Sequence, residues 1–312
     1  MADLILHHYP ASPFSEKIRL VLGYKNLAWK SVLIPSILPK PDVLALTGGY
    51  RKTPFLQIGS DVYCDSALIC EVLEHLQPAP TLYPTPHPGL ARVLAQWAET
   101  TLFWAAMGYN LQSKGVASMF ESAPPEAAKA FVADLAARTA GMTRLRSSDA
   151  TAAYKIYLRR IASMLEGQEF LLDDAPCIAD FATYHPLWFT RRRVPVLAGI
   201  LDATPGVLAW MDRMAALGHG QMERYSAIEA IAVCAAGTGA RALNDTAFED
   251  DHGIAPGSRV TVAAESFGAE TTEGDLIAAT RTRYTLRRTD ERAGTVQVHF
   301  PRIGYVLRKV EA

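Results

Sequence analysis

The sequence predicts an α/β domain, then an all-helical domain, then a small all-β extension. Three observations predict this order. Short apolar runs alternate with amphipathic helical stretches over residues 1–80, and helical periodicity dominates residues 88–230. After a second linker-like stretch, two-residue alternation replaces it in the last 55 residues of the extension, which is expected to span residues 240–312. The 312 residues are enough for two ordinary domains and a small module.

The first region is predicted to fold in the order β-α-β, loop, β-β-α. The predicted strands are residues 4–9, 29–35, 53–59 and 61–64, and the predicted helices are residues 13–25 and 65–76. Phe14, Ile18, Val21 and Leu22 fall on one apolar face of the first helix. Residues 77–88 contain five prolines, which excludes a helix interior and predicts an interdomain linker.

The composition is that of a globular protein and excludes several functional classes. Apolar residues make up 49% of the chain, charged residues 20%, and the formal net charge is −1. There is no positive excess to attract nucleic acid or an anionic membrane. The first residues do not resemble a signal peptide, and no window reaches the ~18 uncharged apolar residues of a membrane span. We therefore expect a cytoplasmic protein that binds neither nucleic acid nor membranes.

The cysteines give no sign of a metal or disulfide framework. Cys64, Cys70, Cys177 and Cys234 form no CxxC pair, and no Cys/His cluster has zinc spacing. We expect buried thiols in a reducing compartment and no metal site. A redox role for Cys64 is an open alternative, although this residue is expected to be buried on a strand.

Ser12 precedes Pro13 at the start of the first predicted helix, in the stretch SPFS. A serine there caps the helix and stabilises it by about 1 kcal/mol. The same place favours an anion, because unpaired N–H groups and the positive end of the helix dipole meet there. A ligand thiol would ionise more readily at this point, and a serine hydroxyl would hydrogen-bond the thiolate. The stretch alone decides neither between cap and catalyst nor between Ser12 and Ser15.

Two further motifs have the same ambiguity. Pro54, in RKTPFL, is either an ordinary edge-strand proline or a cis-proline that exposes the backbone of Thr53 to an extended peptide. Asp65 is either the N-cap of the second helix or a carboxylate for a ligand amine, with Ser66 offering a hydroxyl to a ligand carboxylate. Together with the first helix start, these motifs would form a cradle for a small anionic thiol peptide.

Four stretches, SPFSEKIRLVL, RKTPFLQIG, CDSALICEVLEH and PTLYP, resemble the cytosolic glutathione S-transferase superfamily in its serine-type, bacterial-like form. The helical region after the linker is similar to the second domain of that family. The resemblance implies a thioredoxin-like N-terminal domain, an all-α second domain and usually a homodimer. The small all-β C-terminal extension lies outside it.

The resemblance also implies a site for glutathione as co-substrate. Ser12 matches the catalytic serine that hydrogen-bonds the glutathione thiolate, with Ser15 as the alternative. The glutathione-binding residues are then expected to be Lys52, Thr53, Pro54, Asp65 and Ser66. Lys40 is a weaker candidate than Lys52 for the glycyl carboxylate. A serine in place of a catalytic cysteine argues against disulfide exchange by the protein itself.

The expected chemistry is attack by the bound thiolate on a small hydrophobic electrophile, with the protein lowering the thiol pKa and holding the reactants together. The electrophile site is expected between the two domains. Its candidate residues are Tyr9, Phe103, Trp104 and Met107, with Tyr109 as a further one. For at least half of the residues of the second domain, packing between helices is the better interpretation.

Three features depart from the family pattern. Asp65 stands where Glu or Gln is more usual, and Cys177 stands where the second-domain capping box usually has Ser or Thr, although Asp180 is present. The chain from about residue 240 lies outside the pattern. A non-catalytic binding or scaffolding protein of the same fold is therefore the alternative hypothesis. A tail strand across the glutathione cleft would favour it.

Overall fold

A computed structural model describes residues 3–237, 243, 247–249 and 251–311. The N-terminal region follows the predicted order, and the stretch between the second and third strands, expected to be mostly loop or a short helix, contains helix α2 (Pro41–Thr47). Its elements are β1 (Ile5–His8), α1 (Pro13–Tyr24), β2 (Ala28–Leu33), α2 (Pro41–Thr47), β3 (Phe55–Ile58), β4 (Asp61–Cys64) and α3 (Ser66–Leu76). Strand β1 pairs in parallel with β2 and antiparallel with β3, which pairs antiparallel with β4. This is the thioredoxin-like arrangement expected of the first domain.

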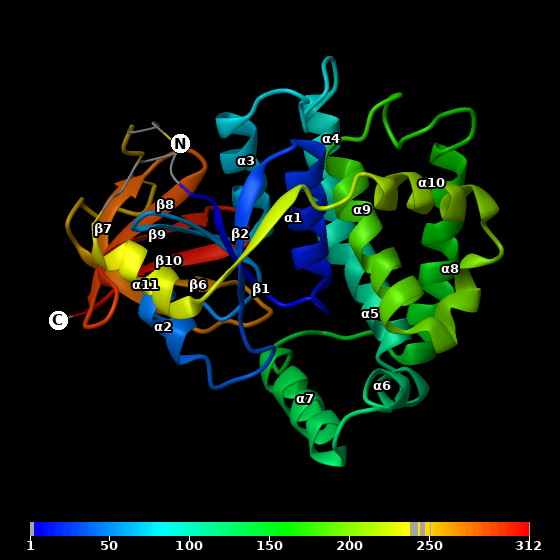
Figure 1. The fold of residues 1–312 in the computed structure, drawn as a ribbon, viewed down its shortest axis with the longest axis horizontal. Coiled ribbons are helices and arrows are strands. Elements are labelled where there is room, and N and C mark those ends of the chain that lie inside the picture. The colour runs from blue at the N-terminus through cyan, green and yellow to red at the C-terminus, as the bar shows by residue number, and fades with distance from the viewer. Residues whose placement is uncertain (1–2, 238–242, 244–246, 250, 312) are drawn as a thin grey trace.

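The helical region packs on this sheet through α1 and α3, which lie between the two (Figure 1). Its elements are α4 (Pro88–Trp97), η1 (Ala98–Leu102), α5 (Phe103–Asn110), α6 (Ser113–Met119), α7 (Pro125–Arg138), α8 (Ser147–Met164), α9 (Ile178–Trp188), η2 (Phe189–Arg193), η3 (Pro195–Leu201) and α10 (Pro205–Ala216). The all-α second domain is confirmed. Helix α7 projects from the lower edge of the molecule in Figure 1, and none of its side chains is fully buried.

A buried carboxylate organises the middle of the helical region. Asp180 accepts hydrogen bonds from the backbone N–H groups of Cys177 (3.0 Å) and Leu171 (2.9 Å) and from the indole N–H of Trp210 (2.9 Å). The carboxylate half of the capping box is therefore formed, although Cys177 stands at the N-cap. Burial raises the pKa of Asp180, and these hydrogen bonds oppose that shift.

The chain then returns to the N-terminal sheet. Helical structure was expected as far as about Tyr225, but the structure has strand β5 (Gln221–Tyr225), followed by α11 (Ala227–Ala235). Strand β5 pairs in parallel with the outer edge of β2. The side chains of β5 are mostly exposed, so the strand has no apolar alternation that a sequence pattern could detect.

The described residues of the C-terminal extension are all-β, as expected, and form five strands. They are β6 (Arg259–Ala264), β7 (Thr272–Ala279), β8 (Arg283–Asp290), β9 (Gly294–Pro301) and β10 (Tyr305–Lys309). Strand β9 pairs in parallel with β4, so the extension continues the first sheet. The result is one ten-stranded sheet in the order β10-β6-β7-β8-β9-β4-β3-β1-β2-β5.

Polar and aromatic contacts stabilise the pairing of β4 with β9. His299 Nε2 lies 2.8 Å from Asp61 Oδ1, and the His299 ring stacks on Tyr63 at 4.4 Å. Nearby, a Cβ atom on Gly49 would lie only 1.9 Å from the carbonyl oxygen of Thr271, so this close approach of two backbones requires glycine. The extension therefore packs directly against the N-terminal region.

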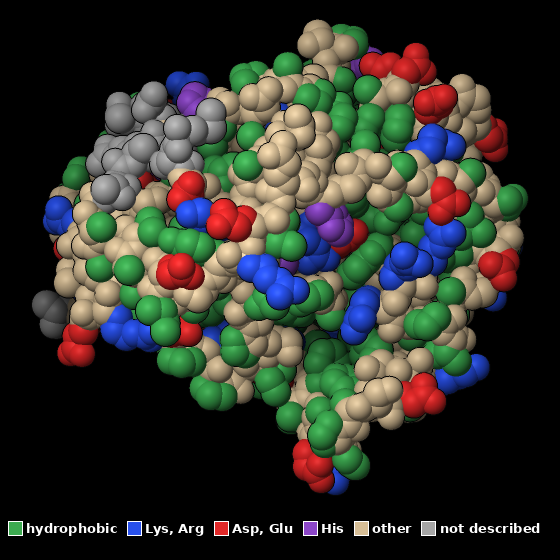
Figure 2. Space-filling view, viewed as in Figure 1, with side chains coloured by type: hydrophobic (Ala, Val, Ile, Leu, Met, Phe, Trp, Pro, Cys, Tyr) green, Lys and Arg blue, Asp and Glu red, His purple; other side chains and the backbone are tan. Residues whose placement is uncertain are grey.

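Two hydrophobic cores result. One lies between the sheet, α1, α3 and the helical region, and the other joins the sheet to α2, α11 and the extension. Among the described residues, no helix is long and apolar enough to cross a membrane. Acidic and basic side chains are interspersed on the face shown in Figure 2 and form no large patch of one sign. The second core makes the extension an integral part of the fold.

Candidate functional site

Helix α1 begins at Ser12, which is its N-cap. The Ser12 Oγ accepts a hydrogen bond from the Ser15 backbone N–H at 3.2 Å. This bond uses a lone pair of the hydroxyl, so the hydroxyl can still donate its proton, either to the nearby Tyr9 oxygen or to a ligand. Ser15 is fully buried, and its own Oγ has no hydrogen-bond partner among the described residues. The cap and a thiolate contact are therefore compatible at Ser12.

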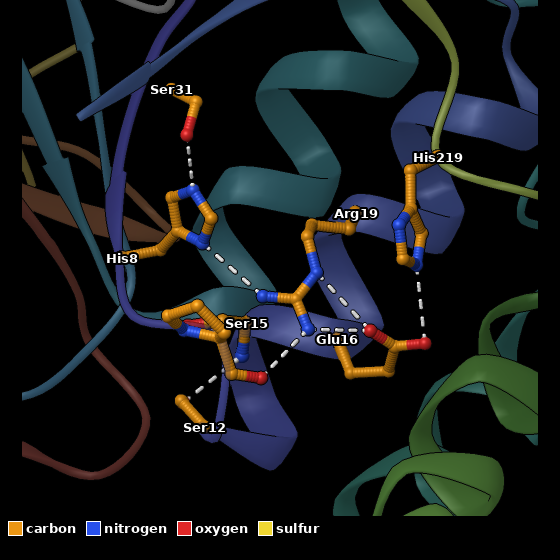
Figure 3. Close-up of polar contacts among 8 residues, drawn as sticks. His8, Ser12, Ser15, Glu16, Arg19, Ser31 and His219 are labelled. Carbon is orange, nitrogen blue, oxygen red and sulfur yellow. Dashed lines mark hydrogen bonds and ion pairs between the residues drawn. The ribbon is translucent and has the colours of Figure 1, made fainter. Parts of the chain in front are cut away.

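An arginine of α1 fixes the turn that carries Ser12 (Figure 3). The Arg19 guanidinium donates to the Pro10 carbonyl oxygen at 3.2 Å and to the Glu16 carboxylate at 2.5 Å. The other oxygen of Glu16 lies 3.2 Å from His219 Nε2, which follows α10. The helical region thus helps to hold the first turns of α1.

His8 completes this network from β1. Its Nδ1 lies 3.2 Å from an Arg19 N–H donor and therefore accepts, so Nε2 carries the proton and donates to Ser31 Oγ at 2.8 Å. Burial and the charge of Arg19 lower the pKa of His8 to about 3. The imidazole is therefore neutral, and its single proton is directed away from Arg19.

The Thr53–Pro54 peptide bond is cis and lies beside a buried ammonium group. Lys40 Nζ donates to the Arg51 carbonyl oxygen at 3.2 Å and lies 3.5 Å from Thr53 Oγ1. It also lies 5.8 Å from the centre of the Tyr9 ring. Burial, followed by the charges of Arg138 and Arg51, lowers the pKa of Lys40 to about 8. Lys40 is thus closer to the predicted peptide-binding edge than the sequence suggested.

Both candidate residues at the start of α3, Asp65 and Ser66, already form hydrogen bonds within the protein. Asp65 Oδ1 caps the helix through the Ala67 N–H at 2.9 Å, and Oδ2 accepts a hydrogen bond from the Tyr305 hydroxyl at 3.0 Å. Ser66 Oγ accepts from Lys17 Nζ at 3.2 Å, and Lys17 forms an ion pair with Glu99. The Lys52 ammonium lies 5.1 Å from the centre of the Tyr305 ring. The N-terminal region, the helical region and the C-terminal extension thus all contribute to the surroundings of α3.

Arg51 links the same three regions and was not among the predicted site residues. Its guanidinium forms ion pairs with Asp134 of α7 and, at 2.9 Å, with Glu270 of the extension. Asp134 Oδ2 also lies 3.0 Å from Nε of Arg138. The Arg138 guanidinium in turn lies 4.9 Å from the Phe267 ring centre. No sequence pattern relates these positions, which are up to 219 residues apart.

The comparisons with known proteins agree with this architecture. Sequence models of the glutathione S-transferase N-terminal and C-terminal domains match residues 6–81 and 148–217. The crystal structure of a glutathione S-transferase-like protein from Pseudomonas syringae is 40% identical, covers 99% of this chain and all of that one, and superposes with a TM-score of 0.82. The chain belongs to the glutathione S-transferase superfamily.

Two curated relatives of this chain have different names. FtsZ-localized protein A from Caulobacter vibrioides is 25% identical over 182 residues, which are 57% of this chain and 72% of the relative. Pyrimidodiazepine synthase from Drosophila melanogaster is 36% identical over 76 residues, which are 23% of this chain and 31% of that protein. Membership of the glutathione S-transferase superfamily therefore leaves the reaction of this chain open.

Within this glutathione S-transferase fold, the candidate electrophile residues lie in different surroundings. Phe103 is 8% exposed and its ring packs 4.9 Å from that of Phe14, while Met107 is 5% exposed. Trp104 lies at the domain boundary, with its ring 5.2 Å from Phe267 of the extension. The Tyr109 hydroxyl donates to a carbonyl of η3 at 2.9 Å, inside the helical region.

Tyr9, the remaining candidate for the electrophile site, contacts Ser12. Burial raises the pKa of the Tyr9 phenol, whereas Arg138 and the Ser12 side chain act in the opposite direction. The Ser12 backbone N–H donates to the Tyr9 carbonyl oxygen at 3.1 Å. Tyr9 therefore links the start of α1 to Arg138 at the end of α7.

The four cysteines are free and buried. Burial raises the pKa of the Cys64 thiol well above its ordinary value and raises that of Cys70 to about 12. Neither thiol is ionised near neutral pH, which argues against Cys64 as a nucleophile or redox sensor. Among the described residues, no group of three or more His, Cys, Asp and Glu side chains is arranged to hold a metal ion.

Proposed function

We propose that this protein is a glutathione transferase that activates the thiolate of glutathione for attack on an electrophilic small molecule. The observation that carries the proposal is the geometry at Ser12. Its oxygen caps α1, its proton is left to donate, and the backbone N–H groups of the first turn face the same end. A thiolate at this point receives a hydrogen bond and the favourable field of the helix.

Positive charge around the cleft supports the same chemistry. Lys40, Lys52, Arg51 and Arg138 lie around Thr53, Tyr9 and the start of α3. Cations near a thiol lower its pKa, because they stabilise the charged form. The thiolate then donates its electron pair to the electrophilic atom, a carbon–sulfur bond forms, and the leaving group departs with its own pair. The protein contributes thiol ionisation and the proximity of the two reactants.

The start of α3 supports the assignment of the γ-glutamyl end. Asp65 offers a carboxylate to the ligand ammonium, and Ser66 offers its backbone N–H to the ligand carboxylate, since its hydroxyl donates to Glu99 at 3.4 Å. The Lys17 ammonium beneath Ser66 adds positive charge to that carboxylate position. The backbone of Thr53, before Pro54, would pair with the cysteinyl part, as in β-strand addition.

The test is calorimetric titration with glutathione at several pH values, with thiolate absorbance followed in parallel. We expect Ser12→Ala to keep glutathione binding but to raise the pKa of the bound thiol by about one unit or more. Turnover with an electrophile should fall about 100-fold, as on removal of one anion-stabilising donor. Ser15→Ala is the matched control, because Ser15 lies three residues further into the same helix and is fully buried.

Two results would contradict this assignment. A normal bound thiolate in Ser12→Ala would remove Ser12 from the chemistry. Absence of glutathione binding by the native protein, even at millimolar concentration, would remove the transferase itself.

A non-catalytic binding or scaffolding protein is the second candidate, and one observation favours it. Ser12 is 2% exposed, Ser66 5% and Arg51 7%, and Arg51 is covered by Asp134 of α7 and Glu270 of the extension. One relative is also known by a localisation, as FtsZ-localized protein A. This candidate predicts no turnover of electrophiles even where glutathione binds.

The remaining parts of the proposal follow from the family and the sequence. We propose a cytoplasmic homodimer with domains at 1–80, 88–230 and 240–312, and a small hydrophobic electrophile bound near Tyr9, Phe103, Trp104 and Met107. Neither nucleic acid nor a membrane is proposed as a partner. Light scattering of the purified chain tests the dimer directly.

A further inference from the structure

The loop between β6 and β7, residues 265–271, lies over the candidate cleft, and we call it the cover segment. Phe267 packs on Trp104, with ring centres 5.2 Å apart, and on the Arg138 guanidinium at 4.9 Å. The Gly268 backbone N–H donates to the Arg138 carbonyl oxygen at 3.2 Å. Glu270 reaches Arg51 at 2.9 Å. The cover segment therefore contacts both the helical region and the N-terminal region around the cleft.

The two carboxylates on Arg51 are held very differently. The Asp134 side chain is 11% exposed and also lies against Arg138, whereas the Glu270 side chain is 37% exposed. Glu270 contacts Arg51 through one oxygen, and its other oxygen has no hydrogen-bond partner among the described residues. An ion pair with a single contact, in which the second carboxylate oxygen is buried and unpaired, is weak. Glu270 is therefore the partner of Arg51 that a competing anion can replace.

Charge favours such a replacement. The cations Lys40, Lys52, Arg51 and Arg138 face the carboxylates of Asp65, Asp134 and Glu270. Withdrawal of Glu270 leaves two carboxylates for four cations, and Arg51 is only 7% exposed. Desolvated positive charge of this kind needs an anion in place of the lost carboxylate.

We propose that Arg51 binds a carboxylate of the ligand in this cleft, and that Glu270 of the C-terminal extension occupies Arg51 until that carboxylate replaces it. The ligand class is a peptide-like thiol with a free carboxylate at the end away from the γ-glutamyl group, as in glutathione. This inference rests on the proposed function, because it assigns one end of the same ligand. Binding then requires the cover segment to release Arg51, so the extension controls access to Ser12.

The test compares two ligands on three proteins by calorimetry. The ligands are glutathione and its glycyl ethyl ester, which lacks the terminal negative charge. The proteins are wild type, Glu270→Gln and the control Glu273→Gln, which removes an exposed pair with Arg259 inside the extension. We expect Glu270→Gln to lower the Kd for glutathione about three- to tenfold and to change that of the ester less than twofold. Glu273→Gln should match wild type for both ligands.

Hydrogen exchange of residues 265–271 gives a second measurement. We expect exchange there to increase when glutathione is added to the wild type, and to be high in Glu270→Gln before any addition. Thermal unfolding confirms that each variant is folded.

Each remaining outcome overturns a distinct claim. Equal glutathione affinity in wild type and Glu270→Gln overturns the exchange of carboxylates. Equal gains for glutathione and its ester overturn the role of Arg51 and reduce the cover segment to a steric barrier. If no variant binds glutathione, the proposed function fails, and this inference fails with it.

Discussion

Two ion-pair clusters connect the N-terminal region to the rest of the molecule, and they differ in burial. The inner joint consists of Lys17, Glu99 and Ser66, and the Lys17 and Glu99 side chains are 1% and 15% exposed. The outer joint consists of Arg51, Asp134 and Glu270, and Glu270 is 37% exposed. A buried pair is costly to break because the remaining charge is left desolvated, whereas an exposed pair exchanges with water and ions at little cost. The inner joint is therefore fixed. In the outer joint Arg51 and Asp134 are only 7% and 11% exposed and stay paired, so the Glu270 contact is the part that can open.

His185 lies beside the inner joint but does not neutralise the charge of Glu99. Its Nε2 lies 3.9 Å from the Glu99 carboxylate, but burial lowers the pKa of His185 well below its ordinary value. Neither ring nitrogen has a hydrogen-bond partner among the described residues. A neutral imidazole cannot replace the ammonium of Lys17. The Glu99 charge depends on that one lysine and on Ser66.

The largest expected effect is therefore on Lys17. We expect Lys17→Met to lower the free energy of unfolding by about 3–5 kcal/mol, because Glu99 is left as an unpaired buried charge. Urea unfolding followed by tryptophan fluorescence measures this. Lys155→Met is the control, since Lys155 is exposed on α8. The double variant Lys17→Met/Glu99→Leu should recover most of the loss. A loss below about 1 kcal/mol in Lys17→Met would show that the inner joint is no more fixed than the outer one.

The next effect concerns the excess positive charge beside the outer joint. Because burial lowers the Lys40 pKa to about 8, the folded protein binds fewer protons than the unfolded chain between pH 8 and pH 10.5. Stability therefore rises with pH across this window. We expect wild type to gain about 2–3 kcal/mol relative to Lys40→Met between these values.

Unfolding free energies of both proteins across that pH range test this, since tyrosines and other lysines titrate equally in the two. Parallel curves would mean that Lys40 is not desolvated. The effective positive charge around Arg51 would then be smaller than the contacts of Lys40 indicate.

The sequence predicts the helix starts beside the two joints, but neither joint itself. The helix starts at Ser12 and Asp65 follow from local patterns, namely a capping residue before an apolar helical period, and α1 was expected at residues 13–25 against the observed Pro13–Tyr24. Glu99 and Glu270 carry no such signal, because their partners are 82 and 219 residues away. Pairing at that distance depends on the packing of whole elements.

The order of strands in the sheet also could not be predicted from the sequence. The alternation in residues 258–310 predicted the strands of the extension, but not that β9 would pair with β4. Strand pairing is formed by backbone groups, which every residue has, so side-chain patterns identify a strand and leave its neighbour unspecified. The position of the cover segment depends on that pairing. The sequence alone could therefore assign no role to the extension.

The smallest effect is expected at the contact between the extension and α3. Tyr305→Phe removes the hydroxyl that donates to Asp65 at 3.0 Å, and burial raises the pKa of Tyr305 so that this proton is present throughout the neutral range. We expect a loss of about 1–2 kcal/mol in unfolding free energy, the contribution of one hydrogen bond to a charged group. Tyr284→Phe should lose less, because its hydroxyl lies 3.5 Å from His252.

The affinity for glutathione shows whether the hydrogen bond from Tyr305 to Asp65 also affects ligand binding. If Tyr305 only anchors the extension, Tyr305→Phe should bind glutathione as well as wild type or better, because Asp65 gains a free oxygen for the ligand ammonium. A weaker affinity would mean that Tyr305 orients Asp65 for the ligand. The extension would then contribute to the binding site as well as covering it, and opening the outer joint would have to leave β10 in place while the cover segment moves.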